Sequence, residues 1–171
     1  ITRATLHATA LGVYNVEING LRVSDEVLAP GWSAYQRRIH SQTYDVTAQL
    51  QPGANSLGAT LGDGWWRGHL NWQKARQHYG KTLALLAQIV ITYTDGRVQV
   101  VGTNGNWQSA TGPILKSDIY NGETYDARLE RLGWSTAGYD TAGWAGVQVE
   151  DFGYATLVAP NGPPVRRVET I

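Results

Sequence analysis

The 171-residue sequence contains no cysteine and only one phenylalanine, and its charges of the two signs balance. Without cysteine the chain can form no disulfide framework, no thiolate metal site and no cysteine nucleophile. Lysine plus arginine and aspartate plus glutamate number 14 each, so there is no net positive field to hold nucleic acid or an anionic membrane. We therefore expect neither nucleic acid nor a membrane among the partners.

A long apolar run and a leader segment are also missing from the sequence. No stretch of about 18 apolar residues could cross a bilayer as a helix. The chain opens at Ile1 without an initiator methionine and without the charged and then apolar segments of a secretion signal. We expect one domain over residues 1–171 that belongs to a longer polypeptide. Composition does not determine its compartment, and secretion or the periplasm is favoured over the cytoplasm.

Alternation of apolar and polar residues predicts strands through most of the chain, whereas no sustained period of 3.6 residues indicates a helix. Leu11 to Val23 is predicted to form a hairpin that turns at Asn19-Gly20. Leu83 to Tyr93 is predicted to turn at Asp95-Gly96 into a second hairpin. Because Leu83 to Tyr93 is apolar at nearly every position, we expect a central strand that is covered on both faces.

Short strands separated by turns at roughly ten-residue spacing predict an all-β fold, an antiparallel two-sheet β-sandwich or jelly roll. The tail is rich in proline, which predicts an extended closing segment over about residues 158–171. Function in such sandwiches usually resides on the loops at their ends.

Tryptophan and tyrosine are abundant, with seven and nine copies. Their rings combine a flat apolar face with a polar group, which suits the cores of sandwiches and also the apolar faces of sugar rings. Leu61 to Gly68 (LGDGWWRG) joins two such rings to a glycine turn, a carboxylate and a guanidinium. If this segment is a strand, its two tryptophans point to opposite faces, so at most one serves the core.

We interpret this octamer and the residues after it as a sugar-binding site, with a purely structural corner as the alternative. The residues assigned to the site are Asp63, Gly64, Trp65, Trp66, Arg67 and Trp72.

A second candidate site is Asp118 to Arg128 (DIYNGETYDAR), where Asn121-Gly122 predicts a hairpin turn. The side chains of Tyr120, Glu123 and Tyr125 are predicted to contact a sugar or a neighbouring domain.

The alternative for this segment is structural, and we favour it for Asp126. A buried acid needs partners, so Asp126 and Arg128 are expected to make buried hydrogen bonds that hold the loop.

Calcium is a further predicted ligand, because it takes six to eight oxygen ligands at about 2.3–2.6 Å. Asp63, Asp118 and Glu123 are the expected suppliers, although no twelve-residue acidic calcium loop is present.

Three ordered stretches carry a family resemblance: Leu11 to Val46, Leu61 to Gly68, and Gly112 to Arg128, followed by a closing Gly162 to Val165 (GPPV). Together they resemble the amino-terminal β-sandwich domain of bacterial α-L-rhamnosidases, the family 78 glycoside hydrolases. One branch of that domain is similar to the family 67 carbohydrate-binding modules, which implies a galactose-binding-like sandwich. In those modules an acidic loop comparable to Gly62 to Trp65 contributes to binding terminal L-rhamnose with calcium, and here Gly64 follows the acid.

The hydrolytic carboxylates of the family lie on a downstream (α/α)₆ barrel, so the resemblance implies that this chain is not itself an enzyme. It implies a non-catalytic accessory module that binds L-rhamnose or a related sugar. One alternative is a structural domain that packs on the catalytic domain of the same parent chain. A third hypothesis, a small glycosidase, would need two carboxylates about 5 to 9.5 Å apart, such as Asp63 with Glu123 or Asp118. Exposed rings beside Asp63 would favour sugar, and a flat apolar patch would favour a domain seam.

Overall fold

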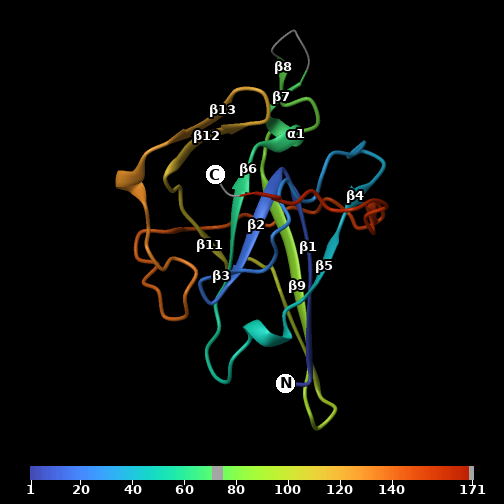
Figure 1. Ribbon diagram of the computed structural model, residues 1–171, viewed down its shortest axis with the longest axis vertical. Coiled ribbons are helices and arrows are strands. Elements are labelled where there is room, and N and C mark those ends of the chain that lie inside the picture. The colour runs from blue at the N-terminus through green and yellow to red at the C-terminus, as the bar shows by residue number, and fades with distance from the viewer. Residues whose placement is uncertain (71–74, 170–171) are drawn as a thin grey trace.

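The computed structural model describes residues 1–70 and 75–169, and most of its regular structure is antiparallel β-sheet. Two sheets make up the body of the molecule, which confirms the predicted all-β sandwich (Figure 1). One has the strand order β10-β9-β1-β5 and the other has the order β3-β2-β6. Their strands are β1 (Arg3–Leu11), β2 (Val13–Ile18), β3 (Leu21–Arg22), β5 (Gln42–Asp45), β6 (Leu57–Gly62), β9 (Ala84–Thr92) and β10 (Val98–Gly102).

The main hydrophobic core lies between these two sheets. Because side chains alternate along a strand, every second residue of β1 and β2 enters it, and Leu6 and Ile18 are fully buried there. Burying one such side chain contributes about 1.5–3 kcal/mol. The buried members of this core are Ala4, Leu6, Ala8, Ala10, Tyr14, Val16, Ile18, Ala29, Val46, Ala87, Ile89 and Ile91.

Both predicted hairpins are present. β2 turns into β3 at Asn19 (φ 52°) and Gly20 (φ 83°), the left-handed conformations that this residue pair tolerates. β9 turns into β10 through Gly96, which also has a positive φ of 83°. The alternation of residues and the choice of turn residues were therefore enough to predict these two hairpins.

The prediction that β9 is covered on both faces is wrong for this chain. Ala87, Ile89 and Ile91 are buried, whereas Leu86 and Gln88 on the opposite face are exposed. β9 is central in its sheet, but a layer covers it on one side only. An apolar run predicts strand formation without saying what packs against each face.

The remaining elements decorate the sandwich or lie at its ends. The closing segment runs alongside an early one: β15 pairs in parallel with β4, and Glu26 bridges to Arg166. Among the described residues no helix is long and apolar enough to span a bilayer. The elements are β4 (Ile39–His40), η1 (Thr47–Gln49), α1 (Gly64–Arg67), β7 (His69–Leu70), β8 (Ala75–Arg76), β11 (Gln108–Ser109), β12 (Ile114–Asp118), β13 (Gly122–Tyr125), η2 (Ala127–Leu129), β14 (Ala145–Gly146) and β15 (Leu157–Val158).

Candidate functional site

The single turn of helix α1 follows β6 at one end of the sandwich, next to the β12–β13 hairpin (Figure 1). Glycine is required at its first position, because Gly64 has φ +52° and a Cβ there would lie 2.6 Å from Cγ1 of Val13. A Cβ on Gly68 would lie 2.4 Å from the carbonyl oxygen of Gly64. The two glycines therefore let the chain turn tightly against the sandwich.

The helical turn distributes the two tryptophans differently from a strand. Side chains on an α-helix are about 100° apart, so Trp65 and Arg67 lie on opposite flanks of Trp66. Trp66 is 5% exposed, and its Nε1 donates to the carbonyl oxygen of Thr82 at 2.8 Å. Trp66 therefore belongs to the core, while Trp65 and Arg67 face the two sides of the turn.

Asp63 sits at the centre of a small ionic cluster and is only 7% exposed. Arg67 Nε donates to its Oδ1 at 2.7 Å, and a terminal nitrogen of Arg76 donates to its Oδ2 at 2.6 Å. Such charge-assisted hydrogen bonds are stronger than those between neutral groups. The side chains of Arg67 and Arg76 remain 34% and 45% exposed, so both are partly open to solvent while they bind a buried carboxylate.

Sequence reasoning missed Arg76, because its position depends on strand pairing. β7 pairs with β8 so that His69 is opposite Arg76, which returns Arg76 to the end of α1. The two-residue strands carry no alternation that could have revealed this ribbon.

Asp118 fastens the β12–β13 hairpin to this cluster. Its Oδ2 accepts from the backbone N–H of His69 at 2.9 Å and from Nδ1 of the same residue at 2.7 Å. Its Oδ1 accepts from the backbone N–H groups of Tyr120 and Asn121, both at 3.0 Å, and from the Asn121 amide at 2.9 Å. Burial acts to raise the pKa of Asp118, but these N–H donors outweigh it and hold the pKa well below 3.8.

The structure does not bring the three predicted calcium ligands together. Asp118 pairs with Gly122 across the hairpin, so the next residue, Glu123, points to the other face. Asp63 is engaged by two arginines. Among residues 1–70 and 75–169 no group of three or more histidine, aspartate or glutamate side chains could hold a metal. Calcium binding stays a prediction.

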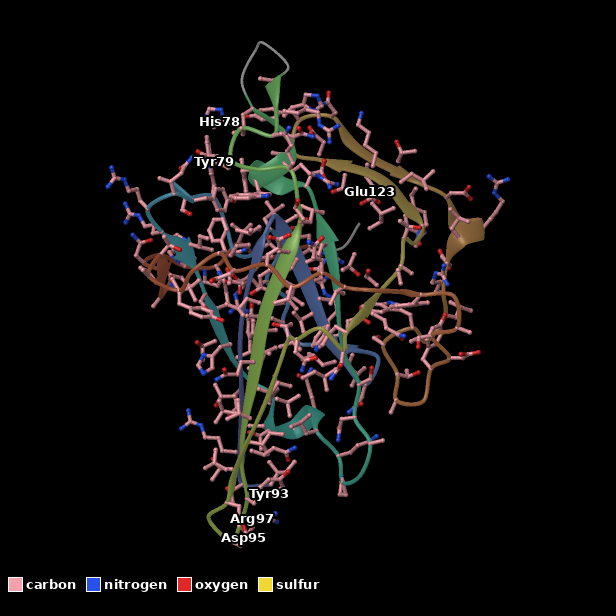
Figure 2. The ribbon with its side chains drawn as sticks, turned by 180° about the vertical axis from the view of Figure 1, so that it is seen from behind. His78, Tyr79, Tyr93, Asp95, Arg97 and Glu123 are labelled. Carbon is pink, nitrogen blue, oxygen red and sulfur yellow. The ribbon has the colours of Figure 1, made fainter. Side chains whose placement is uncertain are left out.

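The other predicted contacts on the hairpin are exposed. Tyr120 is 64% exposed, and Tyr125 is 50% exposed with its hydroxyl donating to Oε1 of Glu130 at 2.7 Å. Glu123 is exposed as well, and in Figure 2 it lies on the other side of α1 from Tyr79. Trp72, also assigned to the site, falls outside the described residues.

The prediction of buried hydrogen bonds between Asp126 and Arg128 is half right. The two residues do pair, with Arg128 Nε at 2.8 Å from Oδ1 and a terminal nitrogen at 2.6 Å from Oδ2. However, the Arg128 side chain is 88% exposed, so the pair is superficial. Asp126 also caps η2 by accepting from the backbone N–H of Arg128. This capping role accounts for an aspartate at this position without a buried ion pair.

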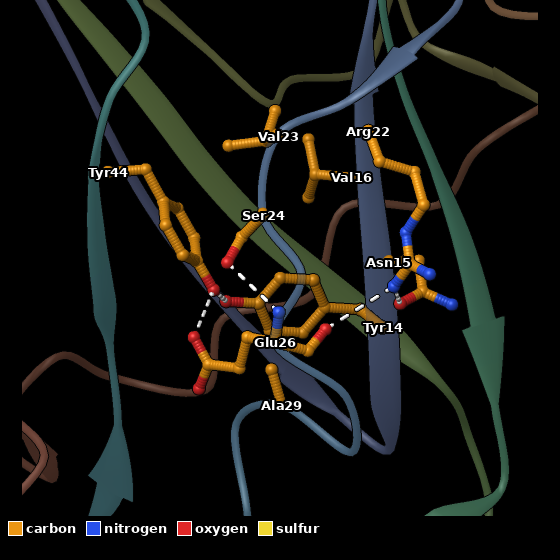
Figure 3. Close-up of a pocket in the computed structure, with 9 residues that line it drawn as sticks. All are labelled: Tyr14, Asn15, Val16, Arg22, Val23, Ser24, Glu26, Ala29 and Tyr44. Carbon is orange, nitrogen blue, oxygen red and sulfur yellow. Dashed lines mark hydrogen bonds between the residues drawn. The ribbon is translucent and has the colours of Figure 1, made fainter. Parts of the chain in front are cut away.

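Two hollows elsewhere in the described part of the chain do not combine room for a sugar with charged side chains. The space beside Tyr14, Tyr44 and Glu26 has a volume of about 10 Å³, which admits a water at most (Figure 3). A groove of about 560 Å³ lies between Ile18, Leu57 and Val101, and no acidic or basic side chain lines it. The α1 end is thus where rings and charged side chains meet.

Comparison with known proteins gives matches along the whole sandwich. A family model described as the alpha-L-rhamnosidase N-terminal domain matches residues 1–169. The alpha-L-rhamnosidase of Streptomyces avermitilis is 44% identical over 167 residues, which cover 97% of this chain and 16% of that protein. That of Alteromonas sp. (strain LOR) is 37% identical over 174 residues, which cover 100% of this chain and 19% of that protein.

Solved structures agree with these matches. The crystal structure of Streptomyces avermitilis alpha-L-rhamnosidase complexed with L-rhamnose superposes with a TM-score of 0.94 at 42% identity, covering 98% of this chain and 16% of that chain. The native enzyme from Aspergillus terreus superposes with a TM-score of 0.92 at 45% identity, covering 98% of this chain and 20% of that chain. The chain therefore spans a fifth or less of the length of these relatives.

The fold and these comparisons place the chain among the β-sandwich domains that form one part of a larger protein. The chain belongs to the alpha-L-rhamnosidase N-terminal domain family. This confirms the resemblance and the expectation of a domain that lacks the catalytic barrel. The similarity to family 67 carbohydrate-binding modules stays a prediction.

Proposed function

We propose that this domain is the non-catalytic, sugar-binding module of an α-L-rhamnosidase and binds terminal L-rhamnose or a related deoxy sugar at the α1 end. One observation carries the proposal: the partly exposed side chains of Arg67 and Arg76 are both held by the buried carboxylate of Asp63. Each guanidinium has five N–H donors, and the contacts with Asp63 use only part of them. The rest suit the hydroxyls of a sugar.

The relatives support the choice of ligand. One related structure, that of the Streptomyces avermitilis alpha-L-rhamnosidase, is a complex with L-rhamnose. L-Rhamnose presents neighbouring hydroxyls, which suit the N–H donors that Arg67 and Arg76 leave free on one side of the α1 turn. Trp65 supplies an aromatic ring on the other flank of the same turn.

Calorimetric titration of the 171-residue chain with L-rhamnose, in the presence of calcium and in the presence of a chelator, tests this function. We expect weak binding of L-rhamnose and no binding of D-glucose, which serves as the non-matching sugar. Arg76→Gln should weaken it on the order of tenfold, because a hydrogen bond to a charged group is lost. Absence of heat with L-rhamnose in both buffers would remove the proposal.

The matched control is Arg97→Gln. Arg97 also forms an ion pair, with Asp95 at 2.6 Å, but at the far end of the sandwich (Figure 2). It should leave the affinity for L-rhamnose unchanged. An equal loss in both variants would show that the effect is not local to the α1 end.

A second candidate function is packing against the catalytic domain of the same parent chain. The outer face of the β9–β10 ribbon favours it, since Val98 and Val100 are 60% and 57% exposed there. Addition of this domain to a separately produced catalytic domain should raise the melting temperature of the latter. Val100→Asp should abolish that gain without altering the binding of L-rhamnose.

A further inference from the structure

Trp32 lies beside α1 in a position that sequence reasoning did not assign to the site. It is 54% exposed and so lies outside the core of this chain. Its ring is parallel to that of Trp65, with 6.1 Å between the centroids and 2° between the planes. Two large rings therefore lie parallel to each other, and more than half of the surface of Trp32 is open to solvent.

Several contacts hold the Trp32 ring in this orientation. Its Nε1 donates to the hydroxyl of Tyr79 at 3.2 Å. Tyr79 in turn packs on the buried Tyr35, with 4.8 Å between the ring centroids. The hydroxyl of Tyr35 donates to the carbonyl oxygen of Gly31 at 3.2 Å, which ties down the loop immediately before Trp32. The exposed ring therefore needs little ordering when it binds a ligand.

The surroundings of Trp32 favour a sugar over a broad protein seam. His78 is exposed and packs edge-on against Tyr79, with 4.9 Å between the ring centroids and 87° between the planes. The Tyr79 hydroxyl lies at the edge of the Trp32 ring. An aromatic face with a polar group at its edge matches a pyranose ring, which has an apolar C–H face and a hydroxyl rim.

The Trp32 ring lies at the same end of the sandwich as the sugar site proposed above. Trp65, on which it stacks, is two residues from Arg67 on α1, and Tyr79, which holds it, is three residues from Arg76. A glycan whose terminal residue contacts the guanidinium groups therefore has an aromatic ring at the same end of the domain for the residue that follows.

We propose that Trp32, stacked on Trp65 and held by Tyr79, is the platform of a second subsite that binds the pyranose ring next to the terminal deoxy sugar. This inference rests on the proposed function. It makes the domain selective for rhamnosyl glycosides over free L-rhamnose.

The experiment compares the affinities of the 171-residue chain for L-rhamnose and for a disaccharide with terminal L-rhamnose. The wild type should bind the disaccharide about three- to tenfold more tightly, the gain expected of one aromatic stacking contact. Trp32→Ala should erase this gain and keep the affinity for L-rhamnose. Trp32→Phe, which retains a flat ring, should keep much of the gain. Tyr93→Ala, a ring removed at the far end of the sandwich (Figure 2), should keep all of it.

The outcomes separate the two proposals. If L-rhamnose binds but the disaccharide gains nothing, or if Trp32→Ala retains the gain, the platform is overturned and the module function stands. If neither sugar binds the wild type, the module function fails. Should Trp32→Ala not fold, the indole N–H resonance of Trp32 in the wild type decides: a shift with the disaccharide but not with L-rhamnose supports the platform, and no shift overturns it.

Discussion

Replacement of Asp118 by asparagine is the sharpest test of how the α1 end is held together. The carboxylate accepts five N–H bonds, two on Oδ2 from His69 and three on Oδ1 from Tyr120 and Asn121. An asparagine retains only one acceptor oxygen, so at least two of these donors must face an NH₂ group.

The expected loss follows from those bonds. The Asp118 side chain is 2% exposed, so water replaces few of the missing contacts. A hydrogen bond to a charged group contributes about 1.5–3 kcal/mol, and two lost bonds that are partly recovered by local rearrangement should cost about 2–4 kcal/mol. Urea unfolding followed by the fluorescence of the seven tryptophans measures the free energy of unfolding.

The matched control is Asp126→Asn, which removes another carboxylate that caps a backbone N–H and pairs with an arginine. Because that pair is at the surface, this variant should lose far less stability. A loss for Asp118→Asn of less than about 0.5 kcal/mol, the range of ordinary surface substitutions, would refute the anchoring role.

The stability that Asp118 contributes should also depend on pH. Its pKa is lowered in the folded state, because the N–H donors prevail over burial. A group with a depressed folded pKa stabilises the fold above its unfolded pKa of about 3.9, and that contribution is lost as the pH falls toward the folded pKa. The difference between wild type and Asp118→Asn should therefore be constant from about pH 6 to 5 and shrink below about pH 4. A difference that grows on acidification would contradict the assignment.

Three further predictions concern packing and metal binding. Gly58→Ala should destabilise the fold by about 1–3 kcal/mol in urea unfolding, because a Cβ there would lie 2.5 Å from Cζ3 of Trp134. Gly112→Ala, with nothing within 4 Å of its Cβ, is its neutral control. Leu6→Ala should cost about 2.7–5 kcal/mol, since Leu6 is 0% exposed, and a cost under about 1 kcal/mol would contradict its place in the core. Calcium, if the predicted ligands bind it, should raise the melting temperature, and Glu123→Gln should reduce that rise; an unchanged melting temperature would leave calcium without a role.

The sequence determined the class of fold and the two main hairpins. The Asn19-Gly20 and Asp95-Gly96 turns lie where alternation predicts them, because strand pleating and turn conformation act over a few residues. The sequence also indicated Leu61 to Gly68 and Asp118 to Arg128 as candidate sites, because both carry rings and acids beside glycine turns.

Only the tertiary structure decided which side chains meet. Asp63 contacts Arg76 because β7 pairs with β8, and Asp118 binds His69 because the β12–β13 hairpin packs beside α1. Trp32 reaches Trp65 from another loop. Such contacts join residues far apart in the chain. They form only when the two sheets pack together and bring the loops at their ends into contact.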